Sequence, residues 1–259
     1  MMTADAMSVA ATGLPPISIL MYHQVGEFSS PESHRASFCH VKRFSAQMWF
    51  LKRFGYNVVS LDQAAAALFE GQPLSGRPVV LTFDDGYRNF LDYAFPVLCR
   101  HRFPATVFLV TGRIGQDSDW VRRAGRQAAP LMSVAEIRDL STRGIGFGAH
   151  SVTHPRLSQI EPARMRDEVQ SSKAQLEAIL QSPVAHFCYP YGDYDAAVRD
   201  AVANAGFDTG LTCIRGAANG AHNAFEIPRK AISYGDSLAG YWWKLHMKHR
   251  RKDPAGYLK

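Results

Sequence analysis

Residues 78–86 read PVVLTFDDG, a run of apolar and β-branched residues followed directly by two aspartates and a glycine. Such a run, bounded by Pro78 and Gly86, is typical of a strand buried in a parallel sheet. Catalytic groups of parallel α/β folds gather at the carboxyl ends of strands, where Asp84 and Asp85 should lie. Adjacent side chains on an extended chain point to opposite sides, which favours different roles for the two carboxylates. The alternative is an ordinary turn in which one aspartate caps the following helix.

On both sides of this segment, apolar runs alternate with stretches whose apolar residues repeat at helical spacing. The expected strands, besides 78–83, cover residues 17–25, 57–61, 105–110, 145–150, 185–190, 207–212 and 226–233. The expected helices cover residues 44–54, 62–71, 87–102, 133–144, 161–181 and 195–206, with one more near the C-terminus. Residues 112–130 look like a loop insertion, and Ser133 and Glu136 form a capping box. This alternation indicates the α/β class and favours a (β/α) barrel over an open sheet.

The composition of the 259 residues excludes several other classes of protein. Hydrophobic residues make up 46% and charged residues 20%, which excludes a disordered or low-complexity chain. No apolar run approaches the ~20 residues of a membrane-spanning helix. Residues 1–16 contain no Lys or Arg and no continuous apolar core, unlike a signal peptide. The four cysteines lack CxxC spacing and fit a reducing compartment, so we predict a cytoplasmic protein.

The net charge is +6, and much of the excess lies in KLHMKHRRK, residues 244–252. The rest of the chain is close to neutral, so no nucleic-acid partner is expected. Together with the preceding aromatic residues, this run is either a solvated helix end or a peripheral attachment to an anionic membrane. We accordingly divide the chain into a flexible segment at 1–16, a main domain at 17–241 and a basic aromatic tail at 242–259.

Two histidines, His150 and His154, lie in GAHSVTHP, residues 148–155, again directly after an apolar run. Imidazoles four residues apart can hold one ion, and neutral imidazole is a common zinc ligand. With one aspartate from the end of the strand at 78–83, they would leave coordination positions open, as in catalytic zinc sites. The HxxxH pattern alone is a weak signal for a metal site, and a carboxylate at a strand end of the same barrel makes it much stronger.

Two further strand ends carry candidate residues. In FCYPYGDYD, residues 187–195, proline and glycine would fix an unusual turn that aims a backbone N–H into the cavity, although an ordinary turn is the alternative. In ILMYHQVG, residues 19–26, His23 ends the first apolar run, where a histidine is either structural or catalytic.

The motifs TFDDG, HSVTH and YPYG, in this order and at these spacings, resemble those of the polysaccharide deacetylase family (NodB-homology domain, carbohydrate esterase family 4). The resemblance covers residues 17–233. It implies a distorted (β/α) barrel and a divalent metal ion, usually Zn²⁺, with Co²⁺, Ni²⁺ or Fe²⁺ as alternatives. It also implies removal of N-acetyl groups, or less often O-acetyl groups, from sugars.

Matched to the family motifs, Asp84 is the catalytic base and Asp85, His150 and His154 are the metal ligands. The backbone N–H of Tyr191, next to Pro190, helps to hold the oxyanion. The resemblance therefore implies that a metal-bound water attacks the acetyl carbonyl while Asp84 takes its proton and an acid protonates the leaving amine.

Two positions depart from the family pattern. Family members usually carry an L-x-H segment near the C-terminus whose histidine is the general acid, and residues 226–243 lack it. LMYH, residues 20–23, is an apolar strand ending in histidine and resembles the circularly permuted poly-N-acetylglucosamine deacetylases, so the acid is assigned to His23. His246 is the second choice.

Cys188 stands where many relatives have an arginine that orients the base, two residues before Pro190. Arg229 or Arg88 could take over this function, and the sequence does not choose between them. The expected substrate is an acetylated amino-sugar saccharide or a lipid-linked sugar. An O-acetyl esterase, a small-molecule amidohydrolase and a non-catalytic carbohydrate-binding relative are the alternatives.

Overall fold

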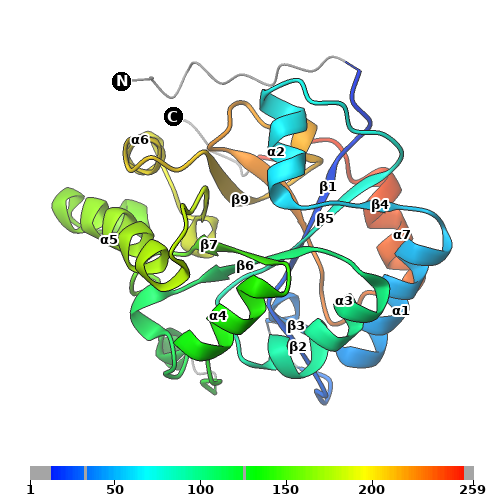
Figure 1. Cartoon of the computed structure of the whole chain (residues 1–259), viewed down its shortest axis with the longest axis horizontal. Coiled ribbons are helices and arrows are strands. Elements are labelled where there is room, and N and C mark those ends of the chain that lie inside the picture. The colour runs from blue at the N-terminus through cyan, green and yellow to red at the C-terminus, as the bar shows by residue number, and fades with distance from the viewer. Residues whose placement is uncertain (1–12, 32–33, 125–126, 254–259) are drawn as a thin grey trace.

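The computed structural model describes residues 13–31, 34–124 and 127–253 (Figure 1). Within these residues, seven parallel strands follow one another in the order β1-β10-β9-β8-β7-β6-β5, and β5 pairs with β1 to close a ring. The strands of the ring are β1 (Ser18–Tyr22), β5 (Pro78–Phe83), β6 (Ala105–Leu109), β7 (Ile145–Ala149), β8 (His186–Cys188), β9 (Thr209–Arg215) and β10 (Ile227–Ala231). The predicted α/β class and (β/α) barrel are confirmed.

Two small pieces of sheet lie outside the ring. The short strand β4 (Asn57–Val58) pairs with the start of β5, and β2 (Gln24–Gly26) pairs with β3 (Phe38–His40). The sequence predicts one strand at 17–25, but the structure divides it at His23 into β1 and β2. Because β1 pairs with β5 and β2 with β3, His23 stands between the two ladders at the end of a barrel strand.

Seven α-helices of the described chain surround the ring (Figure 1). They are α1 (Val41–Arg53), α2 (Leu61–Phe69), α3 (Phe95–His101), α4 (Val134–Thr142), α5 (Pro162–Leu180), α6 (Ala196–Asn204) and α7 (Leu238–Met247). Short 3-10 turns cover Arg35–Ser37, Thr111–Arg113, Asp119–Ala124, Leu157–Gln159, Pro190–Gly192 and Ala218–Gly220, and a π-helical turn covers Phe90–Ala94.

The predicted capping box is present at the start of α4, where Ser133 accepts from the Glu136 backbone N–H and Glu136 accepts from that of Ser133. The predicted helix at 87–102 becomes α-helical only from Phe95, after the π-helical turn. Pro96 explains the change, because it has no N–H with which to continue a regular ladder from the preceding turn.

The barrel wall separates two apolar clusters, because alternate residues of a strand face opposite sides. On β5, Val80 belongs to one cluster, and Leu81 and Phe83 belong to the other. The Val80 cluster also contains Ile17, Ile19, Phe108, Cys188, Leu211 and Ile227, and α2 adds Leu61, Ala64, Ala67 and Leu68 to it. Since α2 packs beside the starting residues of β1 and β5, the carboxyl ends of the strands are left for the polar residues described below.

Residues 242–253 pack with the folded domain, so the described part of the predicted tail at 242–259 is not separate from it. Helix α7 runs across the boundary at 242, and its Tyr241 and Leu245 are buried. These two residues are four apart and therefore lie on one helix face, which packs on the core beside α1. The aromatic and basic residues of this run are thus shared between a buried face and an exposed face.

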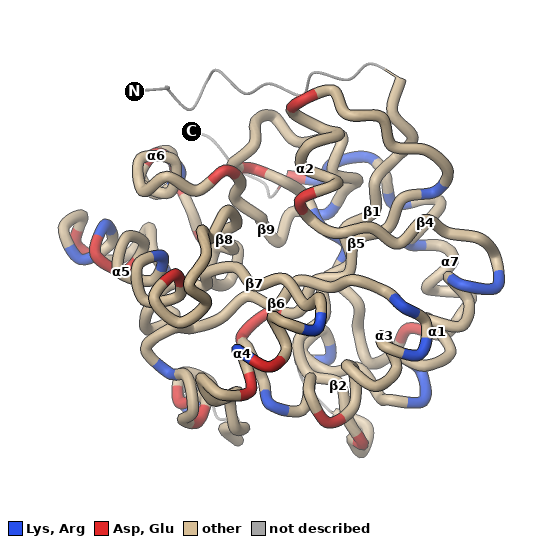
Figure 2. Tube along the Cα trace, viewed as in Figure 1, with Lys and Arg blue, Asp and Glu red and all other residues tan. Residues whose placement is uncertain are grey.

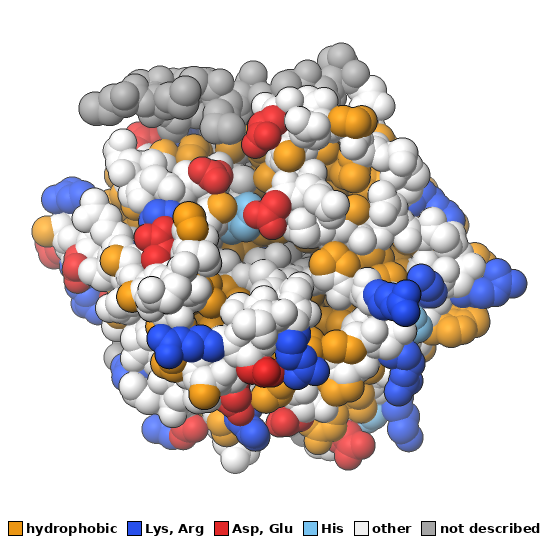
Figure 3. All heavy atoms as spheres, viewed as in Figure 1, with side chains coloured by type: hydrophobic (Ala, Val, Ile, Leu, Met, Phe, Trp, Pro, Cys, Tyr) orange, Lys and Arg blue, Asp and Glu red, His pale blue; other side chains and the backbone are white. Residues whose placement is uncertain are grey.

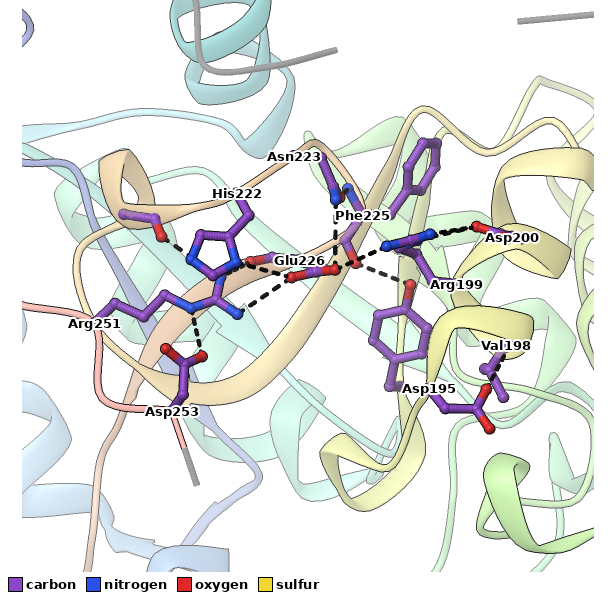
Figure 4. A network of polar contacts seen from close by, with 12 residues as sticks. Asp195, Val198, Arg199, Asp200, His222, Asn223, Phe225, Glu226, Arg251 and Asp253 are labelled. Carbon is purple, nitrogen blue, oxygen red and sulfur yellow. Dashed lines mark hydrogen bonds and ion pairs between the residues drawn. The ribbon is translucent and has the colours of Figure 1, made fainter. Parts of the chain in front are cut away.

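Beyond α7, a buried carboxylate fixes the chain as far as Asp253 (Figure 4). Glu226, just before β10, pairs with Arg199 of α6 at 3.4 Å and with Arg251 at 3.3 Å. Arg251 also donates to the Glu226 backbone carbonyl at 3.0 Å, and the Lys252 N–H donates to Arg215 of β9 at 2.8 Å. Residues 254–259 of the predicted tail lie outside the described residues.

The predicted flexible segment at 1–16 lies mostly outside the described residues, which begin at 13. Of the remainder, the Pro15 carbonyl accepts a hydrogen bond from the Asn219 side chain at 3.3 Å. The same side chain accepts from the Ile17 N–H at 2.7 Å, so Asn219 fixes the entry into β1.

Charges of both signs cover the surface. Figure 2 shows Lys and Arg gathered along α1 and both signs along α5, and the face in Figure 3 mixes charged, apolar and uncharged side chains. On α7, Trp242 and Trp243 are 44% and 47% exposed. In the part of the chain that the structure describes, no helix has both the length and the apolar character needed to cross a membrane.

Candidate active site

The carboxyl ends of four barrel strands meet at a cavity of about 390 Å³. His23 follows β1, Asp84 and Asp85 follow β5, His150 follows β7 and Tyr191 follows β8. The lining also includes Trp120, His154, Arg156, Tyr189 and Cys213. The structure therefore brings together the candidate residues that the sequence places in four separate segments.

Asp85, His150 and His154 form a compact, buried group. The Asp85 Oδ1 atom lies 3.5 Å from His150 Nε2 and 3.3 Å from His154 Nε2. A tetrahedral zinc site with bonds of about 2.0–2.2 Å separates its ligand atoms by roughly 3.3–3.6 Å. One carboxylate and two imidazoles at this spacing fit a single divalent cation with further coordination positions open.

The two rings are held so that their Nε2 atoms face Asp85. His150 Nδ1 carries the proton, because it donates to the Cys188 backbone carbonyl at 2.6 Å, which leaves Nε2 as an acceptor. Burial, helped by the neighbouring His154, lowers the pKa of His150 to about 4. The His150 imidazole is therefore neutral at pH 7, the form that binds metals. The His154 ring packs against Trp120, with ring centroids 4.8 Å apart, and against Tyr191 at 4.5 Å.

A second group, Asp84, His150 and Cys188, also has its ligand atoms close together. Burial raises the pKa of the Cys188 thiol well above its ordinary value, and the thiolate is the form that binds metals. Asp84 is already engaged by an arginine, as described below. The group centred on Asp85 therefore fits a cation better.

Backbone strain is concentrated at this site. Among the described residues, seven that are not glycine have positive φ, and four of them are Asp85 at 77°, Ser151 at 63°, His154 at 60° and Tyr191 at 58°. Non-glycine residues in this conformation cost about 1–3 kcal/mol each and persist where the surroundings fix them. Gly86 continues the turn at 78°, and a Cβ there would lie 2.6 Å from Leu109 Cδ2.

Glu168 holds the loop between the two histidines. This carboxylate of α5 is 4% exposed and accepts from the backbone N–H groups of Val152 and Thr153 at 2.9 and 2.8 Å. It also accepts from the Thr153 hydroxyl. The Ser151 hydroxyl in turn accepts from the His154 N–H at 2.9 Å. These bonds stabilise the strained loop that carries His154.

Asp84 points to a different partner from Asp85. Its two carboxylate oxygens each accept a hydrogen bond from Arg229 at 2.7 Å, and both side chains are buried. Burial acts to raise the pKa of Asp84, but the Arg229 guanidinium is the main group opposing it, and the pKa lies below its ordinary value. Asp84 is therefore ionised at pH 7 and lines the cavity beside the Asp85 group.

Arg229 reaches Asp84 from β10 and is held at all its nitrogens. Nε donates to the Thr212 carbonyl at 2.9 Å, Nη1 also donates to the Thr82 hydroxyl at 3.1 Å, and Nη2 lies 3.0 Å from Cys188 Sγ. Of the two arginines that the sequence offers, the structure therefore places Arg229 at the aspartate.

Arg88 lies outside the site, contrary to its inclusion among the candidate residues. Its side chain is 49% exposed and pairs with Glu136 at 2.8 Å and Asp92 at 3.6 Å. Because Asp92 lies in the π-helical turn and Glu136 in α4, these two ion pairs hold Arg88 at the surface, away from Asp84.

His23, Pro190 and Tyr191 lie where the strand ends predict them. His23 lines the cavity, and its Nδ1 is buried and has no hydrogen-bond partner among the described residues. Pro190 is buried in the 3-10 turn, and Tyr191 is 47% exposed beside His154. His246, the second choice for the acid, instead contacts Tyr56 and Trp242 around α7.

Sequence reasoning missed two residues of the site. Trp120 stands in the stretch taken as a loop insertion, where a 3-10 turn brings it onto His154. The sequence does contain a signal for the buried position of Glu168, because this residue falls on the apolar face of α5 that Met165, Val169 and Leu176 form. A carboxylate on such a face needs buried donors.

A closed (β/α) barrel with two carboxylates and two imidazoles at its carboxyl end defines the class of the protein. The family model for polysaccharide deacetylase matches residues 71–210. The chain therefore belongs to the polysaccharide deacetylase family. The match contains Asp84, Asp85, His150, His154 and Tyr191, whereas His23 and Arg229 lie outside it.

The chain is similar to a putative polysaccharide deacetylase, YxkH, of Bacillus subtilis, with 27% identity over 87% of this chain and 74% of the relative. It is 25% identical to the poly-beta-1,6-N-acetyl-D-glucosamine N-deacetylase of Escherichia coli over 74% of this chain, which spans 33% of that protein. The structure of the deacetylase PplD of Streptococcus pyogenes in complex with acetate superposes with a TM-score of 0.77 and 25% identity, covering 90% of this chain and 99% of PplD.

Proposed function

We propose that the protein is a divalent-metal-dependent hydrolase that removes N-acetyl groups from an amino-sugar saccharide, with zinc as the metal. The observation that carries this proposal is the spacing of 3.3 and 3.5 Å between Asp85 Oδ1 and the two imidazole Nε2 atoms, with the separate carboxylate of Asp84 beside them. A cation bound by Asp85, His150 and His154 would supply Lewis-acid chemistry, by acidifying a water and polarising the acetyl carbonyl.

Asp84 is the proposed base. Its ionised carboxylate faces the cavity and takes the proton of the attacking water as the new C–O bond forms. Arg229 acts on Asp84 as a positioning residue, because its two hydrogen bonds of 2.7 Å fix the plane of the carboxylate. Asp84 and Asp85 thus divide the work, since one carries a proton and the other stays bound to the cation.

His23 is the proposed acid. As the C–N bond breaks, the nitrogen must take a proton, because an amine is a good leaving group and an amide anion is not. His23 lines the same cavity from the end of β1, near the N-terminus. The family usually carries its acid histidine in a segment near the C-terminus instead. The products are acetate and the free amine. The backbone N–H of Tyr191 is the proposed oxyanion donor, which the strained turn at 190–192 supports.

The substrate proposal rests on the relatives and on the acid. The Escherichia coli relative is named for poly-beta-1,6-N-acetyl-D-glucosamine and the Streptococcus pyogenes structure contains acetate, which supports an acetylated amino-sugar polymer. An O-acetyl ester has a leaving group that depends less on protonation, so a histidine at the cavity favours the amide.

Acetate release tests the proposal. The purified chain is incubated with N-acetylated chitopentaose, poly-β-1,6-N-acetylglucosamine and acetylated xylan, with and without chelator, and then with zinc restored. We expect acetate from an N-acetylated saccharide, loss of release with chelator and recovery with zinc. Release from acetylated xylan alone would identify an O-acetyl esterase instead. Full activity in a chelated sample that contains no metal by elemental analysis would reject the metal-dependent mechanism.

A further inference from the structure

A second cavity, of about 470 Å³, adjoins the candidate active site. The two cavities share Trp120, His154, Arg156 and Tyr191, so they lie side by side against a common wall. The second cavity adds Arg113, Asp119, Thr153, Pro155 and Arg164. A substrate group placed over Asp84 and Asp85 would therefore have its neighbour in the second cavity.

The second cavity has an excess of positive charge. Arg113 pairs with Asp119 at 2.9 Å, and these two charges offset each other. Arg156 and Arg164 also line the cavity, and neither has an acidic partner among the described residues. Neither guanidinium is thus paired with a carboxylate, and both line a hollow that is open to solvent.

One of these arginines is already oriented. The Arg156 guanidinium lies over the Tyr191 ring, 4.6 Å from its centroid, and the rings of Tyr191 and His154 meet edge to face. Stacking on an aromatic face restricts the guanidinium while leaving its N–H groups free to bind. The ring of Trp120, stacked on His154, adds an apolar wall of the kind that a sugar ring can cover.

We propose that the second cavity is a subsite for an anionic group, a carboxylate or a phosphate, carried by the saccharide next to its acetylated residue. This inference rests on the proposed function and narrows the substrate to an acidic acetylated saccharide. Guanidinium groups bind planar carboxylate and phosphate oxygens through paired N–H donors, which a neutral sugar does not require. Arg156 and Arg164 supply the charge, and Arg113 holds Asp119 so that its carboxylate does not compete.

Binding to three probes, measured by calorimetry with chelator present to suppress turnover, tests the subsite. The probes are neutral N-acetylated chitotetraose, a tetrasaccharide alternating N-acetylglucosamine with glucuronic acid, and chitotetraose phosphorylated at its reducing end. We expect at least one anionic probe to bind more tightly than the neutral one. If only the uronate probe binds more tightly, the subsite binds a carboxylate. If only the phosphorylated probe does, it binds a phosphate. If both do equally, it binds either anion.

Three variants locate the effect. Arg164 is exposed on α5, and Arg164→Gln should lower the affinity for the preferred anionic probe roughly tenfold. This factor corresponds to the lower end of the free energy of a hydrogen bond to a charged group. The affinity for the neutral probe should change less than twofold. Arg113→Gln should do the same by releasing Asp119. Arg100→Gln on α3 carries the same change in net charge, lies at neither cavity and should leave the affinities unchanged.

Two results would overturn the subsite. In one, neither anionic probe binds the wild-type chain more tightly than the neutral probe. In the other, Arg100→Gln weakens the anionic probe as much as Arg164→Gln does, which would trace the effect to net charge. Acetate release is measured separately with metal present, so anion binding without release on any probe would reject the proposed function and leave the subsite standing.

Discussion

Replacing Arg229 by methionine should lower the free energy of unfolding more than the same replacement of any exposed arginine of this chain. The guanidinium is 1% exposed and donates to both oxygens of Asp84, itself 3% exposed, at 2.7 Å. Arg229→Met removes both charge-assisted bonds and leaves a carboxylate buried without a counter-charge. Breaking a buried pair in this way costs about 3–5 kcal/mol, against a total of about 5–15 kcal/mol for a folded domain.

The loss should depend on pH. In the wild type, Arg229 holds the folded-state pKa of Asp84 below its ordinary value, so the pair stabilises the fold above about pH 4 and stops doing so as the pH falls through that lowered pKa. In Arg229→Met the guanidinium no longer opposes burial, which raises the pKa of Asp84. The folded variant then binds the proton more tightly than the unfolded chain, so its deficit relative to the wild type is larger at pH 7 than at pH 4.5.

Urea unfolding at pH 4.5 and pH 7 measures the effect, with Arg143→Met as the matched control. Arg143 pairs with Asp139 on the surface, both about half exposed, and should cost less than about 1 kcal/mol at either pH. The double variant Asp84→Asn/Arg229→Met should regain part of the loss, because no uncompensated charge is left. An equal loss at both pH values, or a double variant no more stable than Arg229→Met, would refute the reasoning.

Three further predictions concern the proposed roles. Asp84→Asn should keep bound zinc and lose nearly all acetate release, whereas Asp85→Asn should lose the zinc as well; equal zinc contents by elemental analysis would contradict the division of roles. His23→Ala should slow N-acetyl hydrolysis by about 10²–10⁴ while sparing an activated acetate ester, and an equal fall on both substrates would make His23 structural. Glu168→Gln should weaken zinc affinity by about 10–100-fold through the loop that carries His154, as measured by competition with a chelator, and an unchanged affinity would disconnect Glu168 from the site.

The sequence predicts those site residues whose position follows from a strand of their own. Asp84 and His150 come directly after apolar runs, and parallel strands place such residues at one edge whatever the details of the fold. The same reasoning cannot choose between Arg229 and Arg88. The choice depends on which strands close the barrel and on the surface contact of Arg88 with Glu136. Neither can be predicted from the residues next to the two arginines in sequence.

The missed features depend on contacts between segments distant in sequence. Glu168 binds a loop that begins 16 residues earlier, and Trp120 acts through His154 on another strand end. The boundary of the predicted tail failed because composition reports charge and aromaticity but not which face of a helix is buried. Tyr241 and Leu245 belong to the core, while Trp242, Trp243 and Met247 in the same helix are exposed.

Cys188 and Arg229 are best understood as one structural unit. Cys188 lies inside the barrel wall, where its Sγ is 3.0 Å from Arg229 Nη2 and 3.7 Å from Asp84 Oδ2. A larger side chain at 188 would occupy the space that the guanidinium fills, because buried interiors have no spare volume. The small Cys188 at the end of β8 therefore leaves room for the long Arg229 on β10. The buried cation beside the Asp84 carboxylate thus comes from β10 rather than from β8. The Cys188 backbone carbonyl meanwhile binds His150, so this one residue spaces the proposed base from the proposed metal ligands.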